Sequence, residues 1–162
     1  MRLDLERTPA GRSEQPVAGK FALEFDADNP TTVDVSGDLV VDNLEGRCVV
    51  RGDLAAACNV PCGRCLQDFS LQFEVPVELV VLRDSGEETE DTDTLVLHQR
   101  KGEIDLTEAV REATVLAVPQ SRFCRDECRG LCAQCGANLN ETECDCVDDD
   151  VDPRWDNLPD LE

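Results

Sequence analysis

Residues 123–146 read FCRDECRGLCAQCGANLNETECDC and contain six of the ten cysteines in the chain. These six follow the spacing Cys-x3-Cys-x3-Cys-x2-Cys-x8-Cys-x-Cys. The other four lie upstream, and two of them form a further Cys-x-x-Cys pair in the segment PCGRCL at 61–66. Because closely spaced cysteine pairs are typical of zinc ligands that hold small folds together, the pattern predicts a metal-stapled structure.

Eight of the cysteines divide into two groups of four, which is the number of ligands that a tetrahedral zinc ion takes. The C-terminal pairs are close enough in sequence to form one compact site: Cys132, Cys135, Cys144 and Cys146. A second site is predicted to join the upstream pair to the start of the cysteine-rich segment: Cys62, Cys65, Cys124 and Cys128. One single site made from the two Cys-x-x-Cys pairs stays open as an alternative. The remaining two cysteines, Cys48 and Cys58, are interpreted as ordinary buried thiols.

Zinc, in one or two structural sites, is the metal that this ligand set favours. An iron–sulfur cluster would use the same thiolates, but no spacing here matches those of ferredoxins. A catalytic zinc usually keeps one position open for water and has histidine or carboxylate ligands. The chain has a single histidine, His98, and lacks metalloprotease motifs, glycine-rich phosphate loops and serine-hydrolase motifs. The sequence therefore predicts no enzyme and no small-molecule substrate.

The chain carries a formal net charge of −21 and has an isoelectric point near 4.2. Such acidity opposes non-specific binding to nucleic acid and to anionic membranes. Four arginines lie in or next to the cysteine segments: Arg64, Arg122, Arg125 and Arg129. We favour a structural role, in which they offset the negative charge of a tetrathiolate zinc site. The alternative is contact with phosphate or a protein partner, so these four are also the candidates for partner or RNA binding.

The clearest strand signal follows the upstream cysteine pair, where apolar residues occupy every odd position from Phe69 to Leu79. This alternation is typical of a strand in an antiparallel sheet that is covered on one face. Pro76 removes one backbone donor, so we expect an edge or a break at that residue. Further stretches between residues 21 and 58 also have strand character.

One helix is predicted near residues 105–117. Asp105 can cap its start, with Glu108 completing a capping-box-like pair, and Pro119 ends it. The apolar stripe that should face the sheet consists of Leu106, Ala109, Val110, Ala113, Leu116 and Ala117. The expected fold class is α+β, mainly an antiparallel β-sheet with one packed helix and a C-terminal Cys-rich zinc-knuckle module.

Composition divides the chain into four parts. Residues 1–18 are expected to form a loose N-terminal segment, 19–122 the β-rich domain and 123–147 the zinc-binding module. Residues 148–162 are expected to form an acidic tail that ends in a short docking segment. No apolar run has the length of a signal peptide or a membrane span, so we expect a cytoplasmic protein with reduced thiols and no membrane partner.

Several motifs together resemble one known family. In chain order they are PCGRCLQDF at 61–69, IDLTEAVREATVLAVPQSRFC at 104–124, CRGLCAQCGANLN at 128–140, CDC at 144–146 and DPRW at 152–155. Their combination resembles the YceD family, named for large ribosomal RNA subunit accumulation, over about residues 39–161. The resemblance implies a cytoplasmic, non-enzymatic factor that supports normal levels of large-subunit (23S) ribosomal RNA. It also implies that the Cys62–Cys65 knuckle is shared more widely in the family than the C-terminal cysteines.

The partner that this role implies is ribosomal RNA, or a large-subunit ribosomal protein or assembly factor. The charge of −21 fits direct RNA binding poorly unless the arginines form a local basic face. Electrostatic complementarity instead favours a basic protein partner. The alternative function is a zinc-thiolate redox or metal sensor, in which oxidation of the cysteines releases the metal.

Overall fold

The computed structural model describes residues 1–4, 7–26, 29–44, 47–82, 95–98 and 103–146. Along the chain, its elements are β1 (Arg2–Asp4), β2 (Gly11–Asp26), β3 (Asn29–Leu44), β4 (Arg47–Pro61), β5 (Asp68–Leu82), β6 (Leu95–His98), β7 (Glu103–Asp105) and α1 (Thr107–Ala117). The acidic stretch at 84–93, the side chain of His98 and the tail at 148–162 lie outside the described residues. Within the described ranges, no helix has both the length and the apolar character needed to cross a membrane.

Five of the strands form one sheet in the order β2-β3-β4-β5-β6, and β1 pairs with β7 in a small second sheet. Successive strands from β2 to β5 are antiparallel neighbours, as short hairpin connections require. The structure therefore confirms a mainly antiparallel sheet with one helix. The pair β5–β6 differs, because it is parallel, with Leu79 opposite Leu95 and Leu82 opposite His98.

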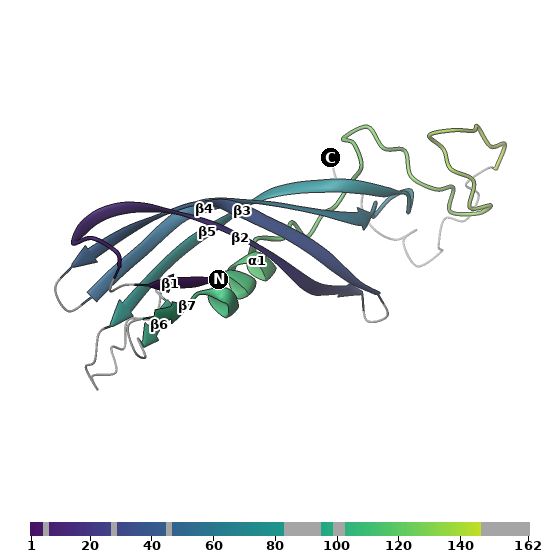
Figure 1. Cartoon of the computed structure of the whole chain (residues 1–162). Helices are drawn as coiled ribbons and strands as arrows, with labels where there is room; N and C mark the ends of the chain where they lie inside the picture. Colours follow the sequence, from purple (N-terminus) through teal and green to yellow (C-terminus); the bar gives the residue numbers. More distant parts are fainter. Residues whose placement is uncertain (5–6, 27–28, 45–46, 83–94, 99–102, 147–162) are drawn as a thin grey trace, which may run out of the picture.

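One face of the five-stranded sheet is apolar, and α1 packs on it, below the arched strands in the view of Figure 1. Alternate residues of each strand point to this face, including Val33 and Val35 on β3 and Val75 and Val77 on β5, all of which are buried. The remaining face carries polar side chains, which explains the period of two in the sequence.

Only part of the apolar stripe expected on α1 is buried against the sheet. Leu106, Ala109 and Val110 are buried, but Leu116 is 85% exposed. Leu116 lies about 120° around the helix from Val110, too far from the centre of the packed face to reach the sheet. Thr114 takes the buried position instead, and its hydroxyl donates to the carbonyl of Val110 at 2.6 Å. A threonine that bonds within its own helix can therefore replace an apolar residue in this core.

The start of α1 also differs from the expected pair. A carboxylate oxygen of Asp105 accepts a hydrogen bond from the backbone N–H of Thr107 at 3.0 Å, so Asp105 does satisfy a free donor at this end. Hydrogen bonds from the side chain and the backbone of Thr107 lower the pKa of Asp105 to about 2. Glu108 does not complete a capping box, because its carboxylate pairs with Arg111 at 2.6 Å. The helix ends at Ala117, and Val118 before Pro119 is extended, as expected.

The N-terminal residues are ordered into strands, contrary to the loose segment that we expected over residues 1–18. Strand β2 pairs with β3 from Gly11 opposite Asn43 to Asp26 opposite Asn29. It is an outer strand of the sheet, where backbone pairing on one side tolerates Pro16. Its first half buries little apolar surface, so the alternation that marks a strand in the sequence is weak there.

Two glycines lie at the point where the pairing between β3 and β4 is interrupted. The strands pair at Asp34–Ser36 and again at Val40–Leu44, with the same register on both sides of the gap. A Cβ atom on Gly52 would lie 2.8 Å from the carbonyl oxygen of Asp38, and one on Gly37 would lie 3.0 Å from Leu54. Only glycine fits at Gly52, because the opposing atom belongs to the backbone and cannot move away alone.

We therefore expect Gly52→Ala to lower the free energy of unfolding by about 1–3 kcal/mol, the usual cost of overpacking. Urea unfolding followed by circular dichroism measures the change. Gly19→Ala is the matched control, since the closest atom to a Cβ there is the flexible end of the Met1 side chain at 2.6 Å, and the Phe21 ring lies at ordinary contact distance, 3.4 Å. Equal stability of the two variants would contradict this account of the close approach.

Candidate metal centres and the arginines around them

The first cysteine pair lies in the turn that connects β4 to β5. The backbone N–H of Cys62 donates to the carbonyl of Gln67 at 2.9 Å, and the N–H of Leu66 donates to the carbonyl of Cys62 at 3.0 Å. Leu66 has a φ of 60°, a left-handed conformation that closes the turn. The turn thus holds the thiols of Cys62 and Cys65 on its inner side, where both are buried.

The segment after α1 brings two more cysteines to this turn. The N–H of Gly63 donates to the carbonyl of Arg122 at 2.7 Å, which places the following residues against the turn. The Sγ atoms of Cys62 and Cys128 lie 3.8 Å apart, and so do those of Cys65 and Cys124. All four sulfurs lie within 4.8 Å of one another. Around a tetrahedral ion with Zn–S bonds of about 2.3 Å, sulfurs are about 3.8 Å apart, so this first group could hold a metal.

Backbone and amide groups favour thiolates in the first group. Burial opposes ionisation of Cys62, but N–H groups of Cys65, Cys124 and Arg64 outweigh it and lower the pKa of Cys62 to about 6. For Cys128, the N–H of Gly130 and the side-chain amide of Asn140 outweigh burial and lower the pKa. Burial and the neighbouring thiols raise the pKa of Cys124 to about 12, as expected where several thiols are crowded together.

The second group is local in the sequence. Cys132, Cys135, Cys144 and Cys146 have all four sulfurs within 4.8 Å of one another. The N–H of Gly136 donates to the carbonyl of Cys132 at 2.9 Å, and its φ of 72° is the positive value expected of the glycine after this pair. Hydrogen bonds from the N–H groups of Cys135 and Gln134 lower the pKa of Cys132 to about 6. Both groups of four thus match the predicted partition.

The two groups differ in exposure. In the first, only Cys124 is not fully buried, whereas in the second Cys135 and Cys146 are exposed. The two remaining cysteines, Cys48 and Cys58, belong to neither group and lie buried in the sheet core. An ion in the first group would be shielded from solvent, and one in the second would be accessible to it.

Asn140 joins the two groups, a role that the sequence did not indicate. Its side-chain amide donates to the Sγ of Cys128 at 3.4 Å, and its side-chain oxygen accepts from the N–H of Arg129 at 2.9 Å. The adjacent Leu139 donates its N–H to the carbonyl of Gly130 at 2.9 Å. In the sequence, Asn140 resembles an ordinary turn residue, because its partners become neighbours only after the chain folds back.

Arg64 is engaged within the fold. Its guanidinium donates to the carbonyls of Asp126 and Cys128 at 3.0 and 3.1 Å and lies 4.1 Å from the centre of the Phe123 ring. Its own carbonyl accepts from the N–H of Leu131 at 3.1 Å. These contacts bind the β4–β5 turn to the cysteine-rich segment, so they favour the structural interpretation of this residue over phosphate contact.

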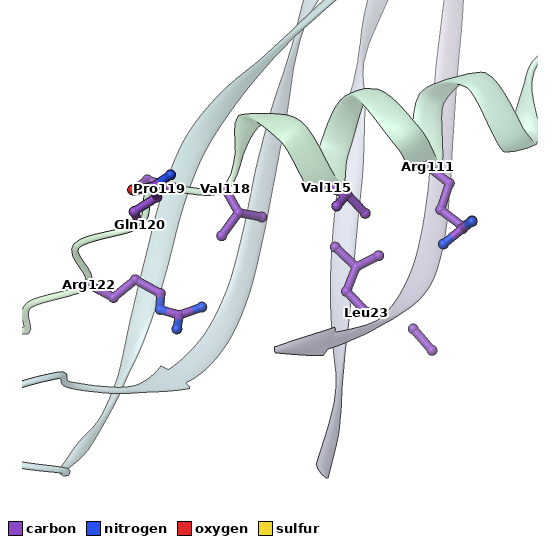
Figure 2. Close-up of a pocket in the computed structure, with 8 residues that line it drawn as sticks. Leu23, Arg111, Val115, Val118, Pro119, Gln120 and Arg122 are labelled. Atoms are coloured by element: carbon purple, nitrogen blue, oxygen red, sulfur yellow. The ribbon is translucent and has the colours of Figure 1, made fainter. Parts of the chain in front are cut away.

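Arg122 has different surroundings from Arg64. It lines a hollow of about 690 Å³ between β2 and the end of α1. Figure 2 shows Arg111 and Arg122 at opposite ends of this hollow, with Leu23 and Val115 between them. Arg111 was not among the sequence candidates, because its spacing to Glu108 indicates only a surface ion pair. The other two candidates, Arg125 and Arg129, are exposed.

Comparison with known proteins finds relatives that are named for large ribosomal RNA subunit accumulation. A chloroplastic protein of Arabidopsis thaliana named large ribosomal RNA subunit accumulation protein YCED homolog 1 is 30% identical, covering 97% of this chain and 60% of that protein. Its namesake in Zea mays is 29% identical over 72% of this chain and 49% of that protein. An uncharacterized protein of Mycobacterium tuberculosis is 32% identical over 76% of this chain and 60% of that protein. No solved structure matches.

The chain spans about 60% of the length of this mycobacterial relative. The family model described as large ribosomal RNA subunit accumulation protein YceD matches residues 50–162. This match includes both cysteine groups, the helix α1 and strand β5. The chain belongs to the YceD family of large ribosomal RNA subunit accumulation proteins.

Proposed function

We propose that this protein is a non-enzymatic ribosome-biogenesis factor that supports accumulation of 23S ribosomal RNA by binding a basic large-subunit protein. The observation that carries the proposal is the YceD family match over residues 50–162 of a chain with a net charge of −21. A role in bacterial ribosome assembly corresponds to a cytoplasmic location, and the plant relatives named above are chloroplastic.

The charges favour a protein partner over direct contact with RNA. Binding to RNA depends mainly on cations that neutralise phosphates. The guanidinium of Arg64 donates hydrogen bonds to carbonyl groups of its own chain. The exposed Arg125 precedes two exposed acids, Asp126 and Glu127. Of these cations, Arg64 is thus engaged within the fold and Arg125 lies next to acidic residues. A basic ribosomal protein is the complementary partner for such a surface.

The two groups of four cysteines are proposed to hold structural zinc. Four thiolates complete the tetrahedral coordination of zinc, so no position is left for a reacting water. In the first group the ion would link the β4–β5 turn to the segment after α1, and in the second it would close the loop between Cys132 and Cys146. This arrangement supports a scaffold and does not support catalysis.

The second group also favours one competing function, a zinc-thiolate redox or metal sensor. Cys135 and Cys146 are exposed, and thiolates that solvent can reach are the ones that oxidants attack. The first group lacks this accessibility, because three of its four cysteines are buried. A sensing role, if present, would belong to the second group alone.

In host cells that lack this protein, we expect the ratio of 23S to 16S ribosomal RNA to fall, with loss of mature large subunits. Capillary electrophoresis of total RNA and sucrose gradients measure both quantities. Expression of the wild-type chain should restore the ratio. An unchanged ratio in the deletion strain would refute the proposed role.

For the purified chain, we expect two zinc ions, one for each group of four cysteines. Replacing Cys62 and Cys65 with serine should remove one ion and markedly lower the unfolding temperature, because binding of a structural metal contributes to folding. Replacing Cys144 and Cys146 should remove the other ion and leave the sheet folded. Mass spectrometry of metals and thermal unfolding measure these effects. Cys58→Ala, a buried cysteine outside both groups, should keep both ions, and loss of an ion from this control would contradict the assignment.

Mild hydrogen peroxide should release one zinc ion first, from the exposed second group, while the unfolding temperature of the sheet stays unchanged. A colorimetric zinc chelator follows the release, and mass spectrometry identifies the oxidised cysteines. A sensor would in addition regain zinc on reduction and change its affinity for the partner. Simultaneous loss of both ions would contradict the difference in exposure between the groups.

A further inference from the structure

An apolar groove of about 370 Å³ runs between β5 and α1. Val77 and Leu79 line it from the strand, and Ala113, Leu116 and Ala117 line it from the helix. Leu116 is 85% exposed, the highest value among the large apolar side chains that the structure describes. We call this feature the β5–α1 groove. Its exposed leucine marks a surface that a partner could cover.

The strand that borders the groove has an open edge. On one side β5 pairs with β4 from Asp68 to Leu82. On the other side it pairs with β6 only from Leu79 to Leu82. Among the described residues, the outer edge of Asp68–Glu78 therefore has no neighbouring strand. Apart from Pro76, which has no N–H, its residues can offer their outward backbone groups to an extended peptide.

The apolar surface continues along this edge beyond the helix. Phe69, Leu71 and Phe73 lie on the same face of β5 as Val77 and are only partly buried. Phe69 also packs against the buried cysteines of the first group. An extended segment paired with the edge could therefore place alternate apolar side chains on this strip, from the groove to the β4–β5 turn.

The charges around the groove indicate which kind of peptide segment is complementary to it. Glu78 and Glu112 line it, and none of the lining residues that the structure describes is a lysine or an arginine. On the opposite flank of α1, the hollow in Figure 2 carries Arg111 and Arg122 instead. A segment that carries lysine or arginine beside its apolar residues is therefore complementary to the β5–α1 groove.

Acidic segments fit the groove poorly, and this argues against occupants from the chain itself. Residues 83–94 contain six acids and one arginine, and residues 147–162 contain seven acids and one arginine. A second copy of the chain would bring a further net charge of −21. Like charges at the rim of a groove oppose docking of all three.

We infer that the β5–α1 groove docks an extended, basic and apolar segment of a large-subunit ribosomal protein. This inference rests on the function proposed above and locates its binding surface. The segment adds to the open edge of β5, an apolar side chain covers Leu116, and cations lie beside Glu78 and Glu112. Docking then supplies a neighbouring strand for the edge that the sheet leaves unpaired.

The test uses the full chain immobilised on a sensor surface. The probe is the protein fraction that lithium chloride extracts from large ribosomal subunits, and retained proteins are identified by mass spectrometry. Leu116→Asp should weaken retention about tenfold or more, as truncation of a central apolar contact does. Val115→Asp is the matched control, because Val115 is the adjacent residue, is 49% exposed and lines the hollow on the other flank. Its binding should stay within about twofold of wild type.

A charge reversal tests whether electrostatic attraction contributes to docking at the β5–α1 groove. Glu112→Lys should weaken retention of the same protein and reduce the dependence of binding on salt. Glu14→Lys makes the same charge change on an exposed position of β2, distant in the sheet order from β5, and should have a smaller effect. Thermal unfolding of every variant confirms that the fold is retained.

The outcomes separate this inference from the proposed function. If the wild-type chain retains no basic large-subunit protein, or instead retains purified 23S ribosomal RNA passed over the same surface as a separate probe, both are overturned. If the wild-type chain retains such a protein, and the variants Leu116→Asp and Glu112→Lys bind it as well as wild type does, the inference about the groove is overturned and the proposed function stands. A photo-crosslinker placed at Leu116 adds a direct readout, since crosslinking to residues 83–94 or 147–162 of the same chain would also overturn the groove.

Discussion

The sulfurs of Cys62 and Cys128 lie 3.8 Å apart although 66 residues separate them in the chain. With Cys65 and Cys124, they join the end of the β4–β5 hairpin to the segment that leaves α1. Together with the hydrogen bond from Gly63 to the carbonyl of Arg122, this contact places the cysteine-rich segment against the end of the hairpin. Arg64 reinforces the same junction through the carbonyls of Asp126 and Cys128. The hydrogen bonds around the junction therefore form where these four cysteines come together.

The helix divides the covered face of the sheet into two surfaces of different character. One flank of α1 carries Arg111 beside the hollow that Arg122 also lines, and the other carries Glu112 and Leu116 beside the open edge of β5. Residues three and four apart share a flank of a helix, so a short helix of mixed composition can present both. In a chain of net charge −21, the separation leaves one apolar surface with an acidic border where a basic partner is complementary.

Several features could be predicted from the sequence because they depend on neighbours along the chain. The alternation from Phe69 to Leu79 predicted a strand with one covered face, and residues 105–117 predicted the helix that ends before Pro119. The glycine after the Cys132–Cys135 pair, Gly136, adopts a positive φ, a conformation that glycine reaches without steric cost. The spacing of the eight cysteines predicted the two groups of four that the fold assembles. Each of these signals is local, or rests on the fixed number of ligands around a metal.

Other features depended on contacts that only the tertiary structure creates. The first residues of β2 have weak alternation, yet pairing with β3 makes them a strand. Leu116 fits an apolar stripe in the sequence, but the orientation of α1 against β5 leaves it exposed and buries Thr114 instead. Asn140 reaches Cys128 only after the chain has folded back. The sequence by itself determined the elements that have strong local signals, such as β5 and α1, because propensity and spacing act locally. The strand at the start of β2, the choice of neighbours and the exposed surfaces were decided by packing between distant segments.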